Sequence, residues 1–136
     1  MWKTEMKIGA VYPTKLRFSI GGFGPWVEIE WQSTRLIYRE GGMGEVEARQ
    51  IFEIIPSARK WLYFWRALDN AHVWEWLPNY RTEIVDGTGW ELVLECGGKR
   101  VISTGSNDFP GGEGEGSKFE IFLRALRRLT GQRGIR

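Results

Sequence analysis

Two runs of alternating apolar and polar residues, separated by a glycine-rich turn, constrain the fold of this chain most strongly. Every second residue is apolar in the segment 14–20 (TKLRFSI), and the segment 26–31 (WVEIEW) repeats this period of two. Such alternation is typical of strands with one buried face. The residues 21–25 between them (GGFGP) form turns readily, so the two runs predict a β-hairpin. Its polar faces are basic on one strand and acidic on the other, which favours the pairing.

The next segments predict two more strands and a helix. Residues 34–39 (TRLIYR) form the third expected strand, and the β-prone residues before Pro56 place a fourth at the end of the run 45–55. Ser57 is a suitable N-cap for a helix that ends near Asn70 or Ala71. The apolar stripe of this helix follows helical spacing and consists of Trp61, Phe64, Trp65, Leu68 and His72. We therefore expect His72 to be packed and hydrogen-bonded rather than catalytic.

A second hairpin and a second helix complete the chain. Residues 90–95 and 99–104 alternate around Gly97–Gly98, and Ser117 caps an amphipathic helix with a strong apolar stripe. The order ββββαββα predicts an α+β fold, with an antiparallel sheet of about six strands and both helices on one face. We interpret residues 1–136 as a single domain, with a β-rich half (1–55), a helix–hairpin–helix half (56–130) and a basic tail (131–136).

The composition favours a cytoplasmic globular protein, and its high aromatic content fits either a large aromatic core or an aromatic binding surface. The net charge is only +2, there is one cysteine, and no apolar run approaches the length of a membrane span. Eight of the 136 residues are tryptophan. The strand and helix patterns predict that Trp31, Trp61, Trp65 and Trp90 are buried and that Trp2 and Trp26 are exposed; they leave Trp74 and Trp76 unassigned.

The sequence contains no recognisable catalytic set. One histidine and one cysteine cannot build the usual zinc sites, so we expect no metal and no cofactor. The loop 111–118 resembles a phosphate-binding loop, but its Ser117–Lys118 order is reversed and two glutamates occupy it. Glu95 and Lys99 straddle a turn rather than sharing a strand face, which argues against a nuclease. Cys96 lies at a hairpin end, where exposure would not by itself make it reactive.

Two polar turns form the best candidate for a binding site. Asp86 and Thr88 precede the second hairpin, and Ser106 and Asn107 follow it, so antiparallel pairing brings them together at one sheet end. Trp74, Trp76 and Tyr80 in the preceding connector are expected to wall the same region. Two interpretations remain open: a recognition site, or turn caps around a core tryptophan. A shallow enzyme site at Asp86, Thr88, Ser106 and Asn107 is a third.

The C-terminal region is rich in arginine and suggests a different function. No acidic residue follows Glu120, whereas five arginines do: Arg124, Arg127, Arg128, Arg133 and Arg136. Such a cluster suits phosphate contacts to nucleic acid, although arginine near a helix C-terminus also complements the helix dipole.

The chain resembles a group of small uncharacterised bacterial proteins. The resemblance covers roughly residues 56–129 and rests on an F-W helix, W-x-W, D-G-x-x-W, G-S-N-x-x-P and a closing helix; residues 111–116 look like an insertion. It implies no activity. The leading hypothesis is a non-catalytic module that binds a protein partner or another copy of itself through an aromatic surface or a sheet edge. A nucleic-acid-binding accessory protein is the alternative.

Overall fold

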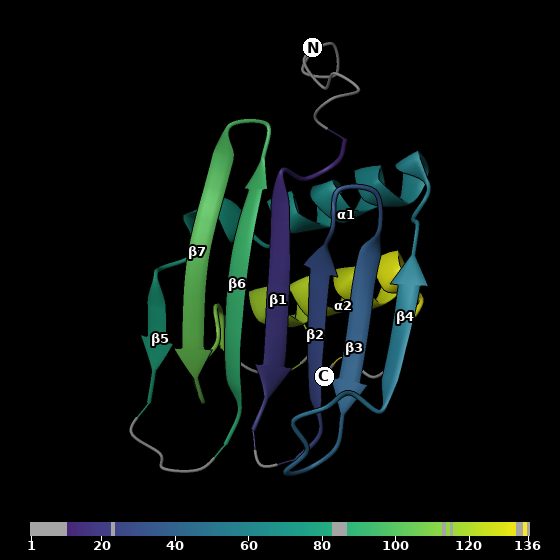
Figure 1. Ribbon diagram of the computed structural model, residues 1–136. Helices are drawn as coiled ribbons and strands as arrows, with labels where there is room; N and C mark the ends of the chain where they lie inside the picture. Colours follow the sequence, from purple (N-terminus) through teal and green to yellow (C-terminus); the bar gives the residue numbers. More distant parts are fainter. Residues whose placement is uncertain are drawn as a thin grey trace.

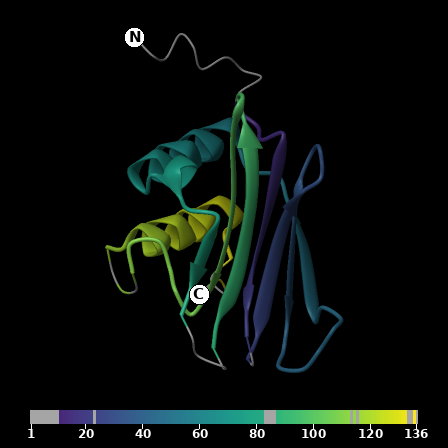
Figure 2. The same cartoon turned by 90° about the vertical axis from the view of Figure 1, so that its left-hand side faces the viewer.

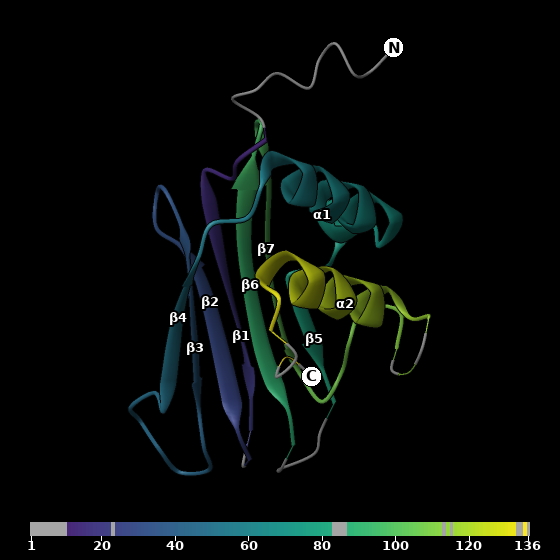
Figure 3. The same ribbon diagram turned by 90° about the vertical axis from the view of Figure 1, so that its right-hand side faces the viewer.

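The computed structural model describes residues 11–22, 24–82, 87–112, 114, 116–132 and 135. One sheet of seven strands, in the order β4-β3-β2-β1-β6-β7-β5, forms one layer of the molecule (Figure 1). Two helices, α1 and α2, form a second layer on one face of this sheet (Figures 2 and 3). The strands are β1 (Lys15–Gly21), β2 (Trp26–Trp31), β3 (Leu36–Gly41), β4 (Gln50–Ile54), β5 (Asn79–Arg81), β6 (Gly89–Cys96) and β7 (Lys99–Ser106).

The two predicted hairpins form and lie side by side. In the first hairpin Phe18 is paired with Ile29, and Arg17 lies opposite Glu30, as the charge pattern predicts. β1 is also paired with β6 over its whole length, with Phe18 opposite Leu92. The first strand of the chain therefore lies inside the sheet, and its apolar face joins the cores of both hairpins.

The predicted α+β class is confirmed, but the strand number is seven rather than six. The additional strand, β5, lies in the connector after α1 and pairs with β7 in a parallel direction. Three residues are too short for an alternating pattern to show in the sequence. Backbone bonds to β7 hold the segment instead, such as that from the N–H of Thr104 to the carbonyl of Pro78, at 3.0 Å.

Both helices begin at the predicted caps. The side chain of Ser57 accepts a hydrogen bond from the N–H of Lys60 at the start of α1 (Ala58–Asn70). Ser117 does the same for Glu120 at the start of α2 (Lys118–Thr130). The helices run antiparallel, so the start of α1 lies beside the end of α2 (Figure 3).

The prediction that His72 is packed on the apolar stripe of α1 is wrong. The helix ends at Asn70, two residues earlier, and His72 adopts a left-handed conformation with φ of 53°. Its side chain is half exposed, and its Nδ1 lies 3.8 Å from a carboxylate oxygen of Glu75. Helical spacing no longer decides the direction of a side chain once the helix has ended.

Aromatic side chains fill the space between the sheet and the helices in two clusters. The cluster under α1 contains Tyr12, Trp31, Trp61, Phe64, Trp65 and Trp74. The cluster under α2 contains Phe18, Trp76, Tyr80, Trp90, Phe109, Phe119 and Phe122. The high tryptophan content therefore serves mainly the core.

The tryptophan predictions are confirmed only in part. Trp61, Trp65 and Trp90 are buried as predicted, and Trp76 is buried too. Trp31 is half-buried rather than buried because it lies at the end of its strand. Trp26 is half-buried rather than exposed, since its Nε1 donates to the carbonyl of Glu45 at 2.8 Å. Trp74 is also half-buried, and Trp2 lies outside the described residues.

Candidate functional site

The two polar turns of the second hairpin meet, as the strand pairing predicts. The side-chain oxygen of Asn107 accepts a hydrogen bond from the N–H of Thr88 at 2.8 Å. The N–H of Asn107 donates to the carbonyl of Thr88, also at 2.8 Å. Asp86, the acidic member of this candidate site, lies outside the described residues. The geometry shows two turns locked to each other by their own polar groups.

The neighbours of this junction are likewise engaged in holding the fold. The hydroxyl of Thr82 donates to the carbonyl of Asn107 at 3.1 Å, and the N–H of Thr82 donates to the carbonyl of Ser106, also at 3.1 Å. Trp90 Nε1 donates to the carbonyl of Asp108 at 3.0 Å. These contacts support a role for the junction in stabilising the end of the sheet.

The three aromatic residues of the connector do not form one wall. Trp76 and Tyr80 both pack on Trp90. Their ring centroids lie 5.8 Å and 5.9 Å, respectively, from the centroid of the Trp90 ring. Trp74 instead stacks on Trp65 and lies under the ammonium of Lys99, which is at the other end of β7. The structure therefore groups Trp76 and Tyr80 around Trp90, whose Nε1 bonds to the turn after Asn107, and separates Trp74 from them.

A small hollow of about 190 Å³ opens beside Thr88. Its wall is mostly apolar and includes Ile20, Phe109 and Leu123. Two polar members of the wall already have partners, because Ser117 caps α2 and Glu120 is paired with Arg127. This hollow offers little polar chemistry to a ligand.

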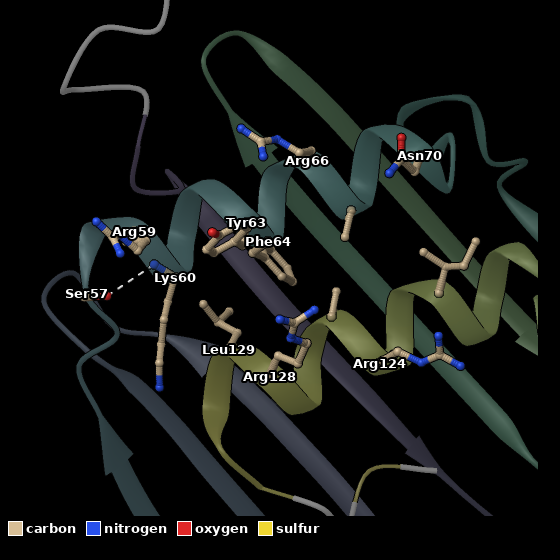
Figure 4. A pocket seen from close by; sticks show the side chains of 13 residues that line it. Ser57, Arg59, Lys60, Tyr63, Phe64, Arg66, Asn70, Arg124, Arg128 and Leu129 are labelled. Carbon is tan, nitrogen blue, oxygen red and sulfur yellow. Dashed lines mark hydrogen bonds between the residues drawn. The ribbon is translucent and has the colours of Figure 1, made fainter.

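A larger groove of about 580 Å³ lies between α1 and α2 on the outer side of the helix layer (Figure 4). Apolar side chains form its floor, and Figure 4 shows Phe64 of α1 and Leu129 of α2 meeting between the helices. Ala67, Ile121 and Ala125 continue this floor. Tyr63, with about half of its surface exposed, stands at the rim.

The rim of this groove is strongly basic. Five exposed cations line it: Arg59, Lys60, Arg66, Arg124 and Arg128. Lys60 extends from α1 toward α2, and Arg128 rises from α2 toward α1, whereas Arg59 and Arg66 point away from α2 (Figure 4). No carboxylate is among the described residues that line the groove. The guanidinium of Arg66 lies 5.8 Å from the centre of the Tyr63 ring.

The charge of the whole chain is divided unevenly between the two layers. The helices α1 and α2 together carry seven basic and two acidic side chains, a formal charge of +5. The remaining chain has twelve basic and fifteen acidic residues, a charge of −3. A net charge of +2 thus conceals a basic helix layer, whose field favours anionic ligands.

Two of the five C-terminal arginines face the groove. Arg124 and Arg128 line it, whereas Arg127 is used within the fold. Arg127 lies 2.5 Å from a carboxylate oxygen of Glu120 and donates to the carbonyl of Ile135 at 2.7 Å. Arg133 and Arg136 lie outside the described residues.

Metal-binding side chains and the cysteine thiol form no second candidate site within the described residues. No three His, Cys, Asp or Glu side chains there come together in a way that would hold a metal ion. Cys96 is buried, and this burial raises the pKa of its thiol, with Lys99 opposing the effect. Neither α-helix described here has the length and apolar character needed to cross a membrane.

Comparison of the chain with protein-family models and with curated proteins finds no match. The resemblance to a group of small bacterial proteins therefore stays a prediction. The groove itself must supply the argument for function.

The sequence interpretation identified one wall of this groove and missed the other. Arginines of α2 stood out because they follow one another near the end of the chain. The cations of α1 were hidden among its tryptophans, although Arg59 and Arg66 are seven residues apart and share a helix face with Tyr63. Their spacing was the available signal.

Proposed function

We propose that this protein is a non-catalytic binding module that recognises an acidic, amphipathic segment of a partner protein in the groove between α1 and α2. The observation that carries the proposal is the combination of an apolar floor with a rim of five cations. A helical or extended peptide with apolar anchors and flanking carboxylates matches both features. Docking of an amphipathic segment into a groove is a common mode of peptide recognition.

The size and shape of the groove suit a cluster of side chains from a peptide better than the flat surface of a folded protein. Its volume of about 580 Å³ lies in the range of sites that enclose several side chains. Phe64 and Leu129 lie at the centre but are almost fully buried, so the apolar contact surface comes from the partly exposed Ala67 and Ile121, and the exposed ring of Tyr63 adds an aromatic surface at the rim. Aromatic and arginine residues are enriched among those that dominate binding energy.

Nucleic acid is the second candidate, because the helix layer carries a formal charge of +5. Arg124 and Arg128 would then contact phosphates, as the sequence suggests, and Tyr63 would stack on a base. The apolar floor favours the peptide, since phosphate contacts do not require one.

Fluorescence anisotropy with two kinds of probe tests the proposal. One probe is a labelled amphipathic peptide with leucines on one helical face and glutamates beside them; a scrambled peptide of the same composition is its control. The other probes are labelled single- and double-stranded DNA. We expect the amphipathic peptide to bind and its scrambled form to bind at least about tenfold more weakly, because only the former presents a continuous apolar face.

A matched pair of variants assigns the binding to the groove. Arg124→Gln with Arg128→Gln removes two positive charges from the rim, and we expect at least about a tenfold loss of peptide affinity. Lys15→Gln with Arg17→Gln removes the same charge from β1, whose exposed side chains lie on the opposite face of the sheet, and leaves binding unchanged. Tight binding of DNA without the peptide would favour the nucleic-acid function instead. Absence of binding to every probe at low salt would contradict both functions.

A further inference from the structure

The two edges of the sheet differ in how well they are protected. One edge consists of β5, which pairs with residues 104–106 of β7, and of the remaining residues 99–103 of β7. β5 has only three residues and follows Pro78, and both features discourage pairing with another chain. β4 forms the opposite edge (Figure 1), and four of its five residues are exposed. An edge strand of this kind leaves a row of backbone groups without partners in the sheet.

Exposed apolar side chains also gather on and near β4. Ten large apolar side chains are exposed among the described residues, and five of them lie between positions 43 and 55. These five are Met43, Val46, Ile51, Phe52 and Ile55, with Ile51 59% and Ile55 78% exposed. Ile51 and Phe52 lie on β4 and Ile55 follows it, whereas Met43 and Val46 lie in the loop before it; exposed apolar residues on and beside an edge strand indicate a surface that another strand covers.

The hydrogen-bond pattern identifies which backbone groups of β4 point outward. The N–H of Gln32 donates to the carbonyl of Arg35, so odd-numbered residues of β3 bond to β2. Even-numbered residues of β3 therefore bond to β4, where their partners are residues 50, 52 and 54. It follows that the N–H and C=O groups of Ile51 and Glu53 face away from the sheet.

We propose that β4 pairs with β4 of a second copy of this chain, antiparallel about a two-fold axis at Ile51. In this register Ile51 of one copy lies opposite Ile51 of the other, so these two exposed isoleucines cover each other. The same register places Arg49, which directly precedes β4 and whose N–H already bonds to the carbonyl of Glu40, beside Glu53 of the other copy, so the two residues can pair there through their side chains. A register centred on Glu53 would oppose two carboxylates, which disfavours it.

The charged residues at the edge already have partners in ion pairs, and both partners, Glu45 and Arg35, are partly buried. Arg49 Nε lies 2.7 Å from Glu45, and Arg35 Nε lies 3.5 Å from Glu53. The side chains of Arg49 and Glu53 are each about two-thirds exposed, so these ion pairs contribute little to stability. Pairing with a second copy exchanges these contacts for the Arg49–Glu53 pair, and the cost lies mainly at Arg35, whose Nε is buried with no hydrogen bond among the described residues. This dimer goes beyond the proposed peptide function and does not depend on it.

Cysteine crosslinking tests the register directly. Opposed residues of a hydrogen-bonded antiparallel pair have Cα atoms about 5.5 Å apart, which suits a disulfide. We expect the Ile51→Cys variant to form a disulfide-linked dimer under mild oxidation. In Glu53→Cys the two cysteines would be offset by four residues, about 13 Å along the strand, and should not crosslink. The unmodified chain, with its buried Cys96, controls for background.

Sedimentation equilibrium over a concentration series measures the association itself. We expect Ile51→Lys to weaken dimerisation by at least about tenfold, because it buries a charge at the centre of the contact. Ile102→Lys changes an isoleucine that is 45% exposed on β7, at the far side of the sheet from β4, and should leave association unchanged. A monomer at every concentration would overturn the proposal. So would equal weakening by both lysine variants, or crosslinking of Glu53→Cys as fast as that of Ile51→Cys.

Discussion

The amide of Asn107 and the backbone of Thr88 hold each other through two hydrogen bonds of 2.8 Å, one to a side chain and one between backbones. Asn107 has a φ of 56°, in the left-handed region that asparagine tolerates better than most residues. This pair joins the start of β6 to the end of β7. The relationship explains why an asparagine is suited to this position without reference to a ligand.

Replacement of Asn107 separates a structural role from a binding role. Asn107→Ala removes the acceptor of the Thr88 N–H and places alanine in a left-handed conformation, so we expect the free energy of unfolding to fall by about 1–3 kcal/mol. Asn107→Gly should lose about 1 kcal/mol less, because glycine adopts this φ freely. Urea denaturation measures both. An alanine variant with unchanged stability would argue for a ligand-binding role.

Gly105 has no room for a side chain. A Cβ atom at this position would overlap Nε1 of Trp90, the same atom that donates to the carbonyl of Asp108. We expect Gly105→Ala to lower the free energy of unfolding by about 2 kcal/mol or more, since the buried ring must move. Gly24→Ala is the matched control, with no heavy atom within 4 Å of its Cβ, and should be nearly neutral. Thermal unfolding of the two variants makes the comparison.

Two buried tryptophans differ in their polar atoms. Trp76 Nε1 donates to the carbonyl of Ala71 at 3.0 Å, whereas Trp61 Nε1 is buried with no hydrogen-bond partner among the described residues. Replacement by phenylalanine reduces ring volume at both sites but breaks a hydrogen bond only at Trp76. We therefore expect Trp76→Phe to destabilise the protein by about 1 kcal/mol more than Trp61→Phe. Equal losses in chemical denaturation would contradict this account.

Stability should fall in alkaline solution, and two residues should account for much of the loss. Burial raises the pKa of the Cys96 thiol. Burial, aided by the hydrogen bond and the charge of Glu40, raises the pKa of Tyr38. For each group the folded state holds its proton more tightly than the unfolded state does. The stabilisation is complete below the unfolded pKa and is lost as the pH rises from there toward the folded pKa.

The two windows can be separated by substitution. Loss from Cys96 should begin near its ordinary pKa of about 8.5, and loss from Tyr38 near about 10. We expect Cys96→Ala to flatten the earlier part of the stability curve and Tyr38→Phe the later part. Urea denaturation at a series of alkaline pH values provides the curve. A wild-type curve that both substitutions leave unchanged would show that other groups cause the alkaline loss.

The strands and helices were largely predictable because their signals are local. The period of two in β1 and β2 and the serines before α1 and α2 each act within a few residues. β5 was not predictable, since a three-residue strand is held by backbone bonds to β7 rather than by its own pattern. The prediction that His72 is packed was wrong for a related reason. The spacing of apolar residues does not show where a helix ends, and α1 ends at Asn70, before His72.

The candidate site shows the same limit. Strand pairing correctly predicted that the turn containing Thr88 meets the turn containing Asn107, because both flank one hairpin. Lys60 of α1 and Arg128 of α2 both line the groove. In the sequence, however, the two helices are separated by β5, β6 and β7. No pattern within either helix indicates that these side chains face one opening.

By itself, the sequence determined which segments become strands or helices and which of their faces are apolar, because backbone preference and side-chain period are properties of short segments. Only the tertiary structure decided which strands and helices lie next to one another. The pairing of β1 with β6 places the N-terminal hairpin beside the second hairpin and leaves β4 at an edge. The antiparallel packing of α1 on α2 gathers scattered cations around one groove, since contacts between distant segments depend on how the whole core packs.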